Sequence, residues 1–419
     1  MLLLCFEKAI YFFGALLLCY QLYFAGVALW GVVKKHREIP RAVPQVRFAC
    51  VIAARNEAAV IGQLVDSLQA QAYPHTLFRV FVAPNNCTDN TAEIALAHGA
   101  EIFLPSGKIT GKGEVLTQVV DKLLAEDEFD AMCVFDADNL VDAQFLQNMN
   151  DAIADGAQVV QGFRDSKNPD QSAMSGCYSI GYWLVNQFYN HSRSTLGLSA
   201  LVNGSGFAVT KQLLTRLGGW HTTTMTEDYE FSAQCACVGE RVRYAPDARI
   251  YDEQPLTFAQ SWKQRRRWTT GSLQGFLRYH STLWEQAVLR RSSVCVDMYL
   301  TFLMPLTQLL GLIVCGGSIV IVLLRGDVVM GSLVVHSLTA VMILLAGSAF
   351  GAVAASSAVA AVAVAQQRST LLSMGKSIAV FWVFLGSFLL LTLLSFIRQK
   401  TTWDPIAHTA AKSIGELAP

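Results

Sequence analysis

Two acidic residues separated by one position stand directly after an apolar run, and they are the first candidates for chemistry. Val134 and Phe135 precede Asp136 and Asp138. Two carboxylates at the end of a buried strand can hold a hard divalent cation, whose open positions then take phosphate oxygens. The pair therefore predicts a diphosphate site. The alternative is that both acids only solvate and cap the end of a strand.

A second acidic pair, Glu227 and Asp228, opens a stretch whose pattern predicts an amphipathic helix. Thr226 can cap this helix, and acids in a first turn are stabilised by the helix dipole. Helix structure alone therefore accounts for this pair as well as a functional role does.

The elements that would position these acids alternate along the chain. We expect strands at residues 48–54, 80–83, 100–104 and 132–135, and helices at residues 60–68, 92–98 and 114–124. This order predicts an α/β fold with an open, mostly parallel sheet covered on both faces. Ligands bind beyond the carboxyl ends of such strands, where the polar clusters 55–57, 85–89 and 136–139 would meet. Neither GxGxxG nor a P-loop follows the first strand, so a nucleotide held by side chains and a metal fits better.

Two later segments carry weaker signals. Residues 159–162 predict an edge strand, and residues 202–208 predict a glycine-bent loop on which a ligand approaches the backbone at Gly204 and Ser205. A tight turn is the alternative for the second segment.

The composition points to a membrane protein. Of the 419 residues 53% are hydrophobic and 15% are charged, against about a quarter charged in a typical soluble protein. Uncharged runs cover residues 9–33, 298–324, 328–365 and 377–397, and each is long enough to cross the hydrocarbon layer. The formal net charge is zero, so no broad basic field predicts nucleic-acid binding.

Basic residues after the first run predict its orientation. Lys34, Lys35, His36 and Arg37 follow directly, as expected of an anchor whose C-terminal flank is cytoplasmic, so residues 34–297 are placed inside the cell. The ten cysteines are scattered without a zinc-binding spacing, which agrees with that placement. Further on, Gln264, Arg265, Arg266, Arg267 and Trp268 lie among aromatic and basic residues, which predicts helices in the membrane interface. A simpler explanation of the three arginines is contact with anionic lipid head groups.

Together these residues resemble the membrane-embedded family 2 glycosyltransferases, which include cellulose, chitin, hyaluronan and poly-N-acetylglucosamine synthases. The resemblance covers about residues 45–290. It is carried by four motifs in order, which are Ala54-Arg55-Asn56-Glu57, Asp136-Ala137-Asp138, Thr226-Glu227-Asp228 and Gln264-Arg265-Arg266-Arg267-Trp268.

The resemblance implies a GT-A fold with transmembrane α-helices. The expected organisation is a transmembrane helix at 9–33, a cytoplasmic GT-A domain at 45–255, interface helices at 256–297, a membrane region at 298–397 and a tail at 398–419. It also implies a nucleotide-sugar donor, with UDP-sugars favoured, and Mg²⁺ or Mn²⁺ as cofactor.

The resemblance assigns roles residue by residue. Asp138 would bind the metal, and Asp136 would contact the donor or share the metal. Asp228 would be the general base beside Glu227. Donor contacts are expected from Ala54, Arg55, Glu57, Asn85, Asp89, Lys112 and Arg267, and acceptor contacts from Gln264, Trp268, Gly204 and Ser205. Because the resemblance supplies one base and no nucleophile for a covalent intermediate, we expect inversion.

One departure concerns the nucleotide. The family usually has an acid directly after the second strand, where this chain has Pro84, Asn85 and Asn86. Asn85 can hydrogen-bond a uracil, and Asp89 lies three residues beyond Asn86.

The acceptor and the number of spans stay open. The favoured acceptor is a growing β-linked polysaccharide of the cell envelope or exterior, with an accessory secretion subunit as a further partner; the alternative is one addition to a lipid acceptor. A transporter with a nucleotide-binding domain is disfavoured because its spans would be expected to carry charges. Arg398 and Lys400 favour four C-terminal spans, whereas Arg368 and Lys376 favour three, the preferred number.

Overall fold

The computed structural model describes residues 1–34, 37–107, 109–325, 327–330, 333–367, 371–399 and 412–417. Several predictions concern residues outside these ranges. They include the basic residues Lys35, His36, Arg368 and Lys400 and most of the tail 398–419.

An eight-stranded sheet is the centre of the catalytic region. Its strands are β1 Phe48–Ala54, β2 Phe78–Pro84, β3 Glu101–Ile102, β4 Ala131–Asp136, β5 Leu140–Val141, β6 Val159–Ser166, β7 Phe207–Thr210 and β8 Arg243–Asp252. They lie in the order β3-β2-β1-β4-β7-β6-β8-β5. The β3-β2-β1-β4 part is parallel, whereas β7 is antiparallel to both β4 and β6. The sheet is therefore mixed, since the antiparallel β7 divides its two parallel parts.

The prediction of an edge strand at 159–162 is wrong. β6 runs from Val159 to Ser166 and lies inside the sheet between β7 and β8. It continues past Gly162 because its polar second half pairs with β8, where Arg164 lies opposite Ile250.

Helices cover both faces of this sheet. They are α2 Ile61–Gln69, α3 Thr91–Ala97, α4 Lys112–Ala125, α5 Phe145–Ala154, α6 Ala173–Leu184, the π-helical turn η2 Val185–His191, α7 Ser192–Leu196, α8 Lys211–Leu217 and α9 Glu227–Cys237, with a short 3₁₀ turn at His75–Leu77. One core joins α4, α6, α8 and α9 to the sheet, and the other joins α2, α3 and α5. In β1, Val51 faces the first core and Ile52 the second, as expected when a strand is buried on both sides.

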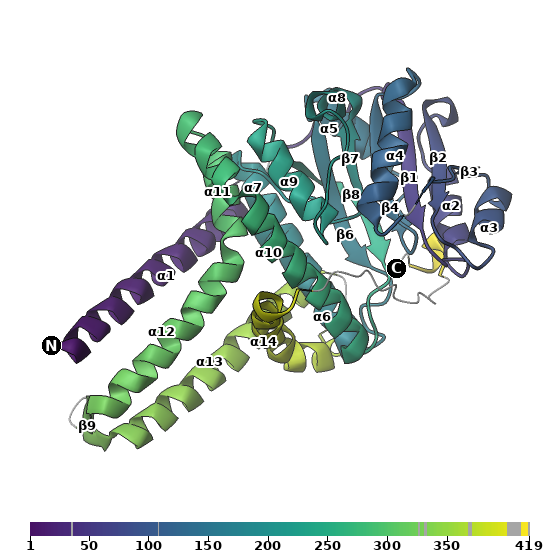
Figure 1. The fold of residues 1–419 in the computed structure, drawn as a ribbon. Coiled ribbons are helices and arrows are strands. Elements are labelled where there is room, and N and C mark those ends of the chain that lie inside the picture. The colour runs from purple at the N-terminus through teal and green to yellow at the C-terminus, as the bar shows by residue number, and fades with distance from the viewer. Residues whose placement is uncertain are drawn as a thin grey trace.

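The remaining helices carry the apolar runs. α10 Phe258–Leu289 and α11 Ser293–Phe302 border the catalytic region, and α1 Leu2–Val33, α12 Met304–Arg325, α13 Ser337–Gln366 and α14 Gly375–Ile397 follow the expected spans. The hairpin β9 Asp327–Met330 and β10 Leu333–His336 joins α12 to α13, and a 3₁₀ turn covers Ile414–Glu416. α1, α12, α13 and α14 are each long and apolar enough to cross a membrane. α1, α12 and α13 project away from the sheet, whereas α14 lies against α10 and α6 and is seen nearly end-on (Figure 1).

Candidate active site

A cavity of about 520 Å³ opens at the carboxyl ends of the central strands. Most of the predicted site residues line it: Arg55, Glu57, Asn85, Lys112, Asp136, Asp138, Gly204, Glu227, Asp228, Gln264, Arg267 and Trp268. They come from the ends of β1, β2 and β4, from the loop before β7, and from α4, α9 and α10. The structure therefore brings all four sequence motifs to one cavity.

Cations surround the first carboxylate of the acidic pair. The Lys112 ammonium donates a hydrogen bond to Asp136, and Arg164 Nη2 lies 4.0 Å from Asp136 Oδ2. Burial alone would raise the pKa of Asp136, but Lys112 and Arg164 outweigh it and lower that pKa. Asp136 is therefore held as a carboxylate. The second acid, Asp138, accepts a hydrogen bond from the Glu253 backbone N–H at 3.1 Å.

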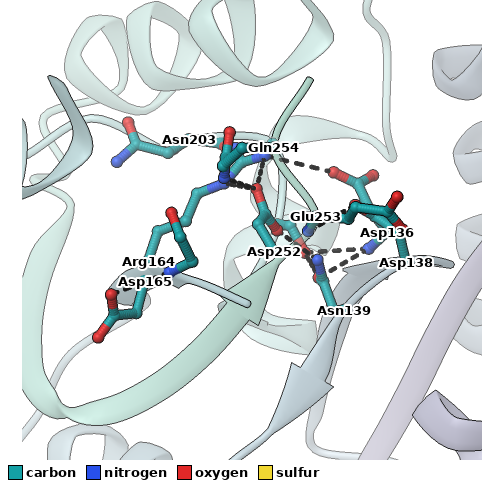
Figure 2. Close-up of polar contacts among 12 residues, drawn as sticks. Asp136, Asp138, Asn139, Arg164, Asp165, Asn203, Asp252, Glu253 and Gln254 are labelled. Carbon is teal, nitrogen blue, oxygen red and sulfur yellow. Dashed lines mark hydrogen bonds and ion pairs between the residues drawn. The ribbon is translucent and has the colours of Figure 1, made fainter. Parts of the chain in front are cut away.

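A buried polar network supports this pair from below (Figure 2). Asp252, at the end of β8, bonds both Arg164 and the side chain of Asn139. Ser205 donates to Asn139 and accepts from the backbone N–H of Asp136. Arg164 of β6, Asp252 of β8 and Ser205 of the loop before β7 all take part in this network. Because they lie on three different elements, the network fixes the end of β4, and with it the direction of the Asp136 and Asp138 side chains.

The two acids suit a divalent cation by their chemistry. Asp136 and Asp138 supply hard oxygen donors at the cavity, as Mg²⁺ or Mn²⁺ requires. Among the residues that the structure describes, no group of three or more His, Cys, Asp or Glu side chains forms a metal site of its own. The donor set therefore fits a cation that completes its shell with diphosphate oxygens and water.

The second acidic pair begins α9 inside the cavity. Burial raises the pKa of both Glu227 and Asp228, and for Glu227 the neighbouring Asp228 charge adds to the effect. Glu227 Oε1 lies 3.9 Å from Lys112 Nζ. Asp228 instead lies against Gly204, where a β-carbon would be only 3.2 Å from Asp228 Oδ2. Gly204 has a φ of +80°, so this loop needs glycine both for its conformation and for the close approach.

The raised pKa of Asp228 gives a pH prediction. Only the carboxylate can accept a proton, so kcat/KM of a base-dependent reaction falls as the pH drops through this pKa. The midpoint of this fall in kcat/KM should lie above pH of about 3.9, the pKa of an ordinary aspartate, because burial disfavours the charged form of Asp228. The pH profile of kcat/KM measures it. A profile that stays flat down to pH of about 4 would contradict the role of Asp228 as a base.

The helix α10 forms part of the cavity wall through Gln264, Arg267 and Trp268. Arg267 Nη1 donates to the Met225 carbonyl at 2.8 Å, and the Trp268 ring packs edge-on against Tyr178 and Tyr182. Gln264 Oε1 is buried without a hydrogen-bond partner in the protein. The helix α10 therefore gives the cavity an aromatic ring and a side-chain oxygen without a hydrogen-bond partner.

The predicted N-cap bond of Thr226 is absent. Thr226 does precede α9, but its Oγ1 is buried without a hydrogen bond. Its side chain packs against Gly271 of α10, where a β-carbon would lie 2.3 Å from Thr226 Oγ1. Thr226 therefore serves as the contact point between α9 and α10.

This contact gives a second prediction. Gly271→Ala must displace Thr226 or α10, which moves Asp228 relative to Arg267 and Trp268 of α10, and we expect about 10²-fold loss of turnover. Gly275→Ala on the same helix makes a milder contact, 3.0 Å from the Phe302 ring against 2.3 Å from Thr226 Oγ1 for Gly271→Ala, and is the matched control. Turnover of both variants, alongside their thermal stability, checks this; equal activities would contradict it.

Three predicted residues do not line the cavity. Ala54 is buried at the end of β1, and its carbonyl accepts the Asn85 N–H. Asp89 accepts hydrogen bonds from Ala58 and Thr91, so it organises the loop after β1. Ser205 is fully buried in the network beneath Asp136. Asn85 does line the cavity, but its side-chain oxygen accepts from Arg55 at 2.6 and 2.9 Å.

Several cavity residues were missed from the sequence. Arg164, Tyr182, Asp252 and Glu253 all line it. Arg164, Asp252 and Glu253 lie at or beside the carboxyl ends of β6 and β8. The rule that located Asp136, polar residues at the carboxyl end of a strand, would have located these three if the full length of β6 and the strand β8 had been predicted. Tyr182 carries no such signal.

Comparison with known proteins agrees with this geometry. The model of the family described as "Glycosyltransferase like family 2" matches residues 44–271, more than half of the chain. "Probable glycosyltransferase YdaM" of Bacillus subtilis (strain 168) is 27% identical over 64% of each chain. "Beta-monoglucosyldiacylglycerol synthase" of Synechocystis sp. is 25% identical over 57% of this chain and 50% of that protein. "Poly-beta-1,6-N-acetyl-D-glucosamine synthase" of Staphylococcus aureus (strain COL) is 25% identical over 56% of each. The chain thus spans about half to two thirds of the length of these relatives.

A solved structure shares the fold over nearly the whole chain. The mannosyltransferase PcManGT from Pyrobaculum calidifontis, solved with GDP-Man and Mn²⁺, superposes with a TM-score of 0.61 at 18% identity and covers 94% of this chain and 100% of its own. The expected GT-A fold with apolar membrane helices is confirmed. With its four motifs around one cavity and a family match over residues 44–271, this membrane protein belongs to the family 2-like glycosyltransferases.

Proposed function

We propose that the protein is an inverting glycosyltransferase that moves a sugar from a nucleotide-diphosphate donor to a growing β-linked polysaccharide. The observation that carries the proposal is the arrangement of charge in one cavity. Lys112 and Arg164 lie beside Asp136, close to Asp138, and the partly buried Asp228 lies against Gly204, whose carbonyl accepts a hydrogen bond from Lys112 at 2.6 Å.

The chain's own residues account for a direct displacement. Asp228 accepts the proton of the acceptor hydroxyl as its oxygen attacks the anomeric carbon. The bond from that carbon to the diphosphate oxygen breaks, and Lys112 and Arg267 stabilise the negative charge that develops there. Asp136 and Asp138 would hold the cation, which supplies further charge stabilisation at the diphosphate. One displacement at the anomeric carbon inverts its configuration.

The remaining residues would bind and orient the substrates. Arg55, Glu57 and Asn85 would contact the nucleotide at the ends of β1 and β2, and UDP-sugars are the favoured donors. Gln264 Oε1, which has no hydrogen-bond partner in the protein, would accept a hydrogen bond from a hydroxyl of the acceptor sugar. The Trp268 ring would support an apolar sugar face. Glu227 would hold Lys112 at the diphosphate, 3.9 Å from its own carboxylate.

The catalytic domain is placed in the cytoplasm, at the cell membrane. This orientation is supported by the basic residues that follow α1, among them Lys34 and Arg37, because Lys and Arg are more frequent on the cytoplasmic side of a span. Arg37 pairs with Asp155 and Arg41 pairs with Asp151, so this flank is also attached to the catalytic domain.

A lipid acceptor is the second candidate. Val185, Leu201 and Val202 give the cavity an apolar side near η2, beside the membrane helices. An amphipathic acceptor could place its hydroxyl at Asp228 and its tail along this side. One relative is named as a synthase of monoglucosyldiacylglycerol, a glycolipid, which supports this candidate.

Turnover by the protein in native membranes tests the function. UDP-, GDP- and dTDP-sugars are offered with Mg²⁺ or Mn²⁺, and release of nucleoside diphosphate is compared with membranes carrying Asp228→Asn. We expect one donor class to be consumed only by the unmodified protein. An ethanol-precipitable polymer identifies the first acceptor, and a chloroform-soluble product identifies the second. Equal release from both membranes for every donor would contradict the proposal.

A further inference from the structure

The helix α14 has the length and composition of a span, but its contacts differ from those of the other apolar helices. It has 23 residues, so it is about 35 Å long, enough to take one end across the hydrocarbon layer. Yet 33% of its apolar segment is buried in the protein, against 11% for α1 and 6% each for α12 and α13.

Both ends of α14 touch the catalytic region. Near its start, Cys177 of α6 approaches the Ser377 carbonyl at 3.5 Å, and a β-carbon on Gly176 would overlap Ser377. Near its end, Thr269 of α10 bonds Ser395 at 3.0 Å, and just beyond it Gln274 Nε2 donates to Gln399 at 3.3 Å. A helix that crossed the bilayer would carry one end away from this region.

The middle of α14 is held in the same way. Arg265 of α10 is fully buried, and its Nη1 donates to the Phe384 carbonyl at 2.7 Å and to Ser387 at 2.6 Å. Phe384 also packs edge-on against Tyr178 of α6. Arg265 therefore contacts α14 and not lipid head groups, which corrects the simpler explanation of the arginine cluster for this residue.

The helices α6 and α10 are not spans themselves. Both line the catalytic cavity, α6 through Tyr182 and α10 through Lys263, Gln264 and Arg267. In contrast, α1 and α12 project away from the sheet (Figure 1). Glu7 near the start of α1 pairs with Arg325 at the end of α12 at 2.9 Å. The direction across the membrane is thus set by α1, α12 and α13, and α14 runs across that direction (Figure 1).

The face of α14 that the protein leaves uncovered is apolar. It carries Trp382 and Leu390, which are 45% and 56% exposed. Lys376 near the start and Arg398 just beyond the end are exposed, as suits positions at the level of anionic head groups. This face adjoins the apolar surface of α13, whose Ser357 donates to the Ile378 carbonyl at 3.3 Å.

We propose that α14 lies along the membrane interface on the catalytic side, with its apolar face in the lipid of one leaflet, and does not cross the bilayer. Among the helices that the structure describes, α1, α12 and α13 then cross the bilayer. The proposal goes beyond glycosyl transfer and does not depend on the donor or acceptor. It has one consequence for the site, because α14 holds Arg265 and, through Tyr178, the Trp268 ring, and so sets the acceptor wall at the level of the head groups.

Depth measurements on the full chain in phosphatidylcholine–phosphatidylglycerol vesicles test this. Nitroxide labels are placed singly at Trp382, Leu390 and Phe396 on the uncovered face, in a background whose exposed and partly exposed cysteines are replaced. We expect the same shallow depth at all three, from the ratio of collisions with oxygen and with a water-soluble nickel complex. Labels on α12 at Ile313, Val320 and Leu324 are the matched control, and their depth should change along the helix.

The same measurement can overturn the proposal. A depth on α14 that changes along the helix as it does on α12 would mean that α14 crosses. Labels shielded from both oxygen and the nickel complex would mean that a protein, such as a second copy of the chain, covers the face. Variants are compared only when they elute as the unlabelled protein does, so that a folding defect is not taken for a change of depth.

Sidedness gives an independent readout. Lys376→Cys and Arg398→Cys flank α14, and Asp127→Cys, whose native side chain is 99% exposed, reports the catalytic side. An impermeant maleimide added to spheroplasts and to inverted vesicles should label all three from the same side. Labelling of Arg398→Cys from the side opposite to Asp127→Cys, or from neither side, would overturn the proposal.

Discussion

Asp228→Asn is expected to lower kcat by about 10²–10⁴-fold while leaving donor affinity unchanged. Asparagine keeps the shape of the side chain but cannot take the proton of the acceptor hydroxyl. A loss of 10³-fold corresponds to about 4 kcal/mol of transition-state stabilisation. Donor affinity should persist, because Asp136, Asp138 and Lys112, which would hold the cation and the diphosphate, are unchanged. Single-turnover kinetics and donor titration measure the two quantities separately.

Glu227→Gln is the matched control for this result. Glu227 is the neighbouring buried carboxylate, and its pKa is raised for the same main reason, burial. Its Oε1 lies 3.9 Å from Lys112 Nζ, so loss of its charge should disturb the position of Lys112 and weaken donor binding more than it lowers kcat. If Glu227→Gln lowers kcat as much as Asp228→Asn does, the assignment of the base to Asp228 fails.

Asp138→Asn is expected to raise the concentration of Mn²⁺ or Mg²⁺ needed for half-maximal turnover on the order of 10²-fold. The substitution removes one of two carboxylates that can face the cation, and Asp136 already shares its charge with Lys112 and Arg164. Complete removal of the metal with a chelator should abolish turnover of the unmodified protein. Metal titration of turnover, and of donor binding by calorimetry, checks the effect.

The exposed Asp170→Asn provides the charge-matched control, because Asp170 does not line the cavity. Its metal dependence should match that of the unmodified protein. If turnover of the unmodified protein survives exhaustive chelation, or if Asp138→Asn leaves the metal titration unchanged, Asp138 is not a metal ligand in this reaction.

The local patterns of the chain predicted the first half of the sheet well. β1 and the central residues of β2 and β4 are apolar runs buried on both faces, and such runs are visible in the sequence. β6 was misjudged because its second half, from Phe163 to Ser166, is mostly polar. Those residues are strand residues because β8 pairs with them, and that strand is far away along the chain. The antiparallel position of β7 likewise depends on pairing that no local pattern encodes.

In the site too, residues in local motifs were predicted and residues that depend on distant contacts were missed. Asp136, Asp138 and Asp228 were predicted because they belong to short contiguous motifs. Arg164 and Asp252 were missed, since their role comes from contact with each other across 88 residues. Arg265 was explained by lipid contact because its neighbours in sequence are basic, yet its partners Phe384 and Ser387 lie about 120 residues later on α14.

The anomeric configuration of the product tests the central claim most directly. The claim is that one displacement, with Asp228 as the base, transfers the sugar. The donor identified by turnover carries a known anomeric configuration, and nuclear magnetic resonance of the isolated product reads the configuration of the new linkage. An α-linked donor should give a β-linked product. A product that retains the α configuration would contradict the account, because retention requires a second displacement or a different mechanism.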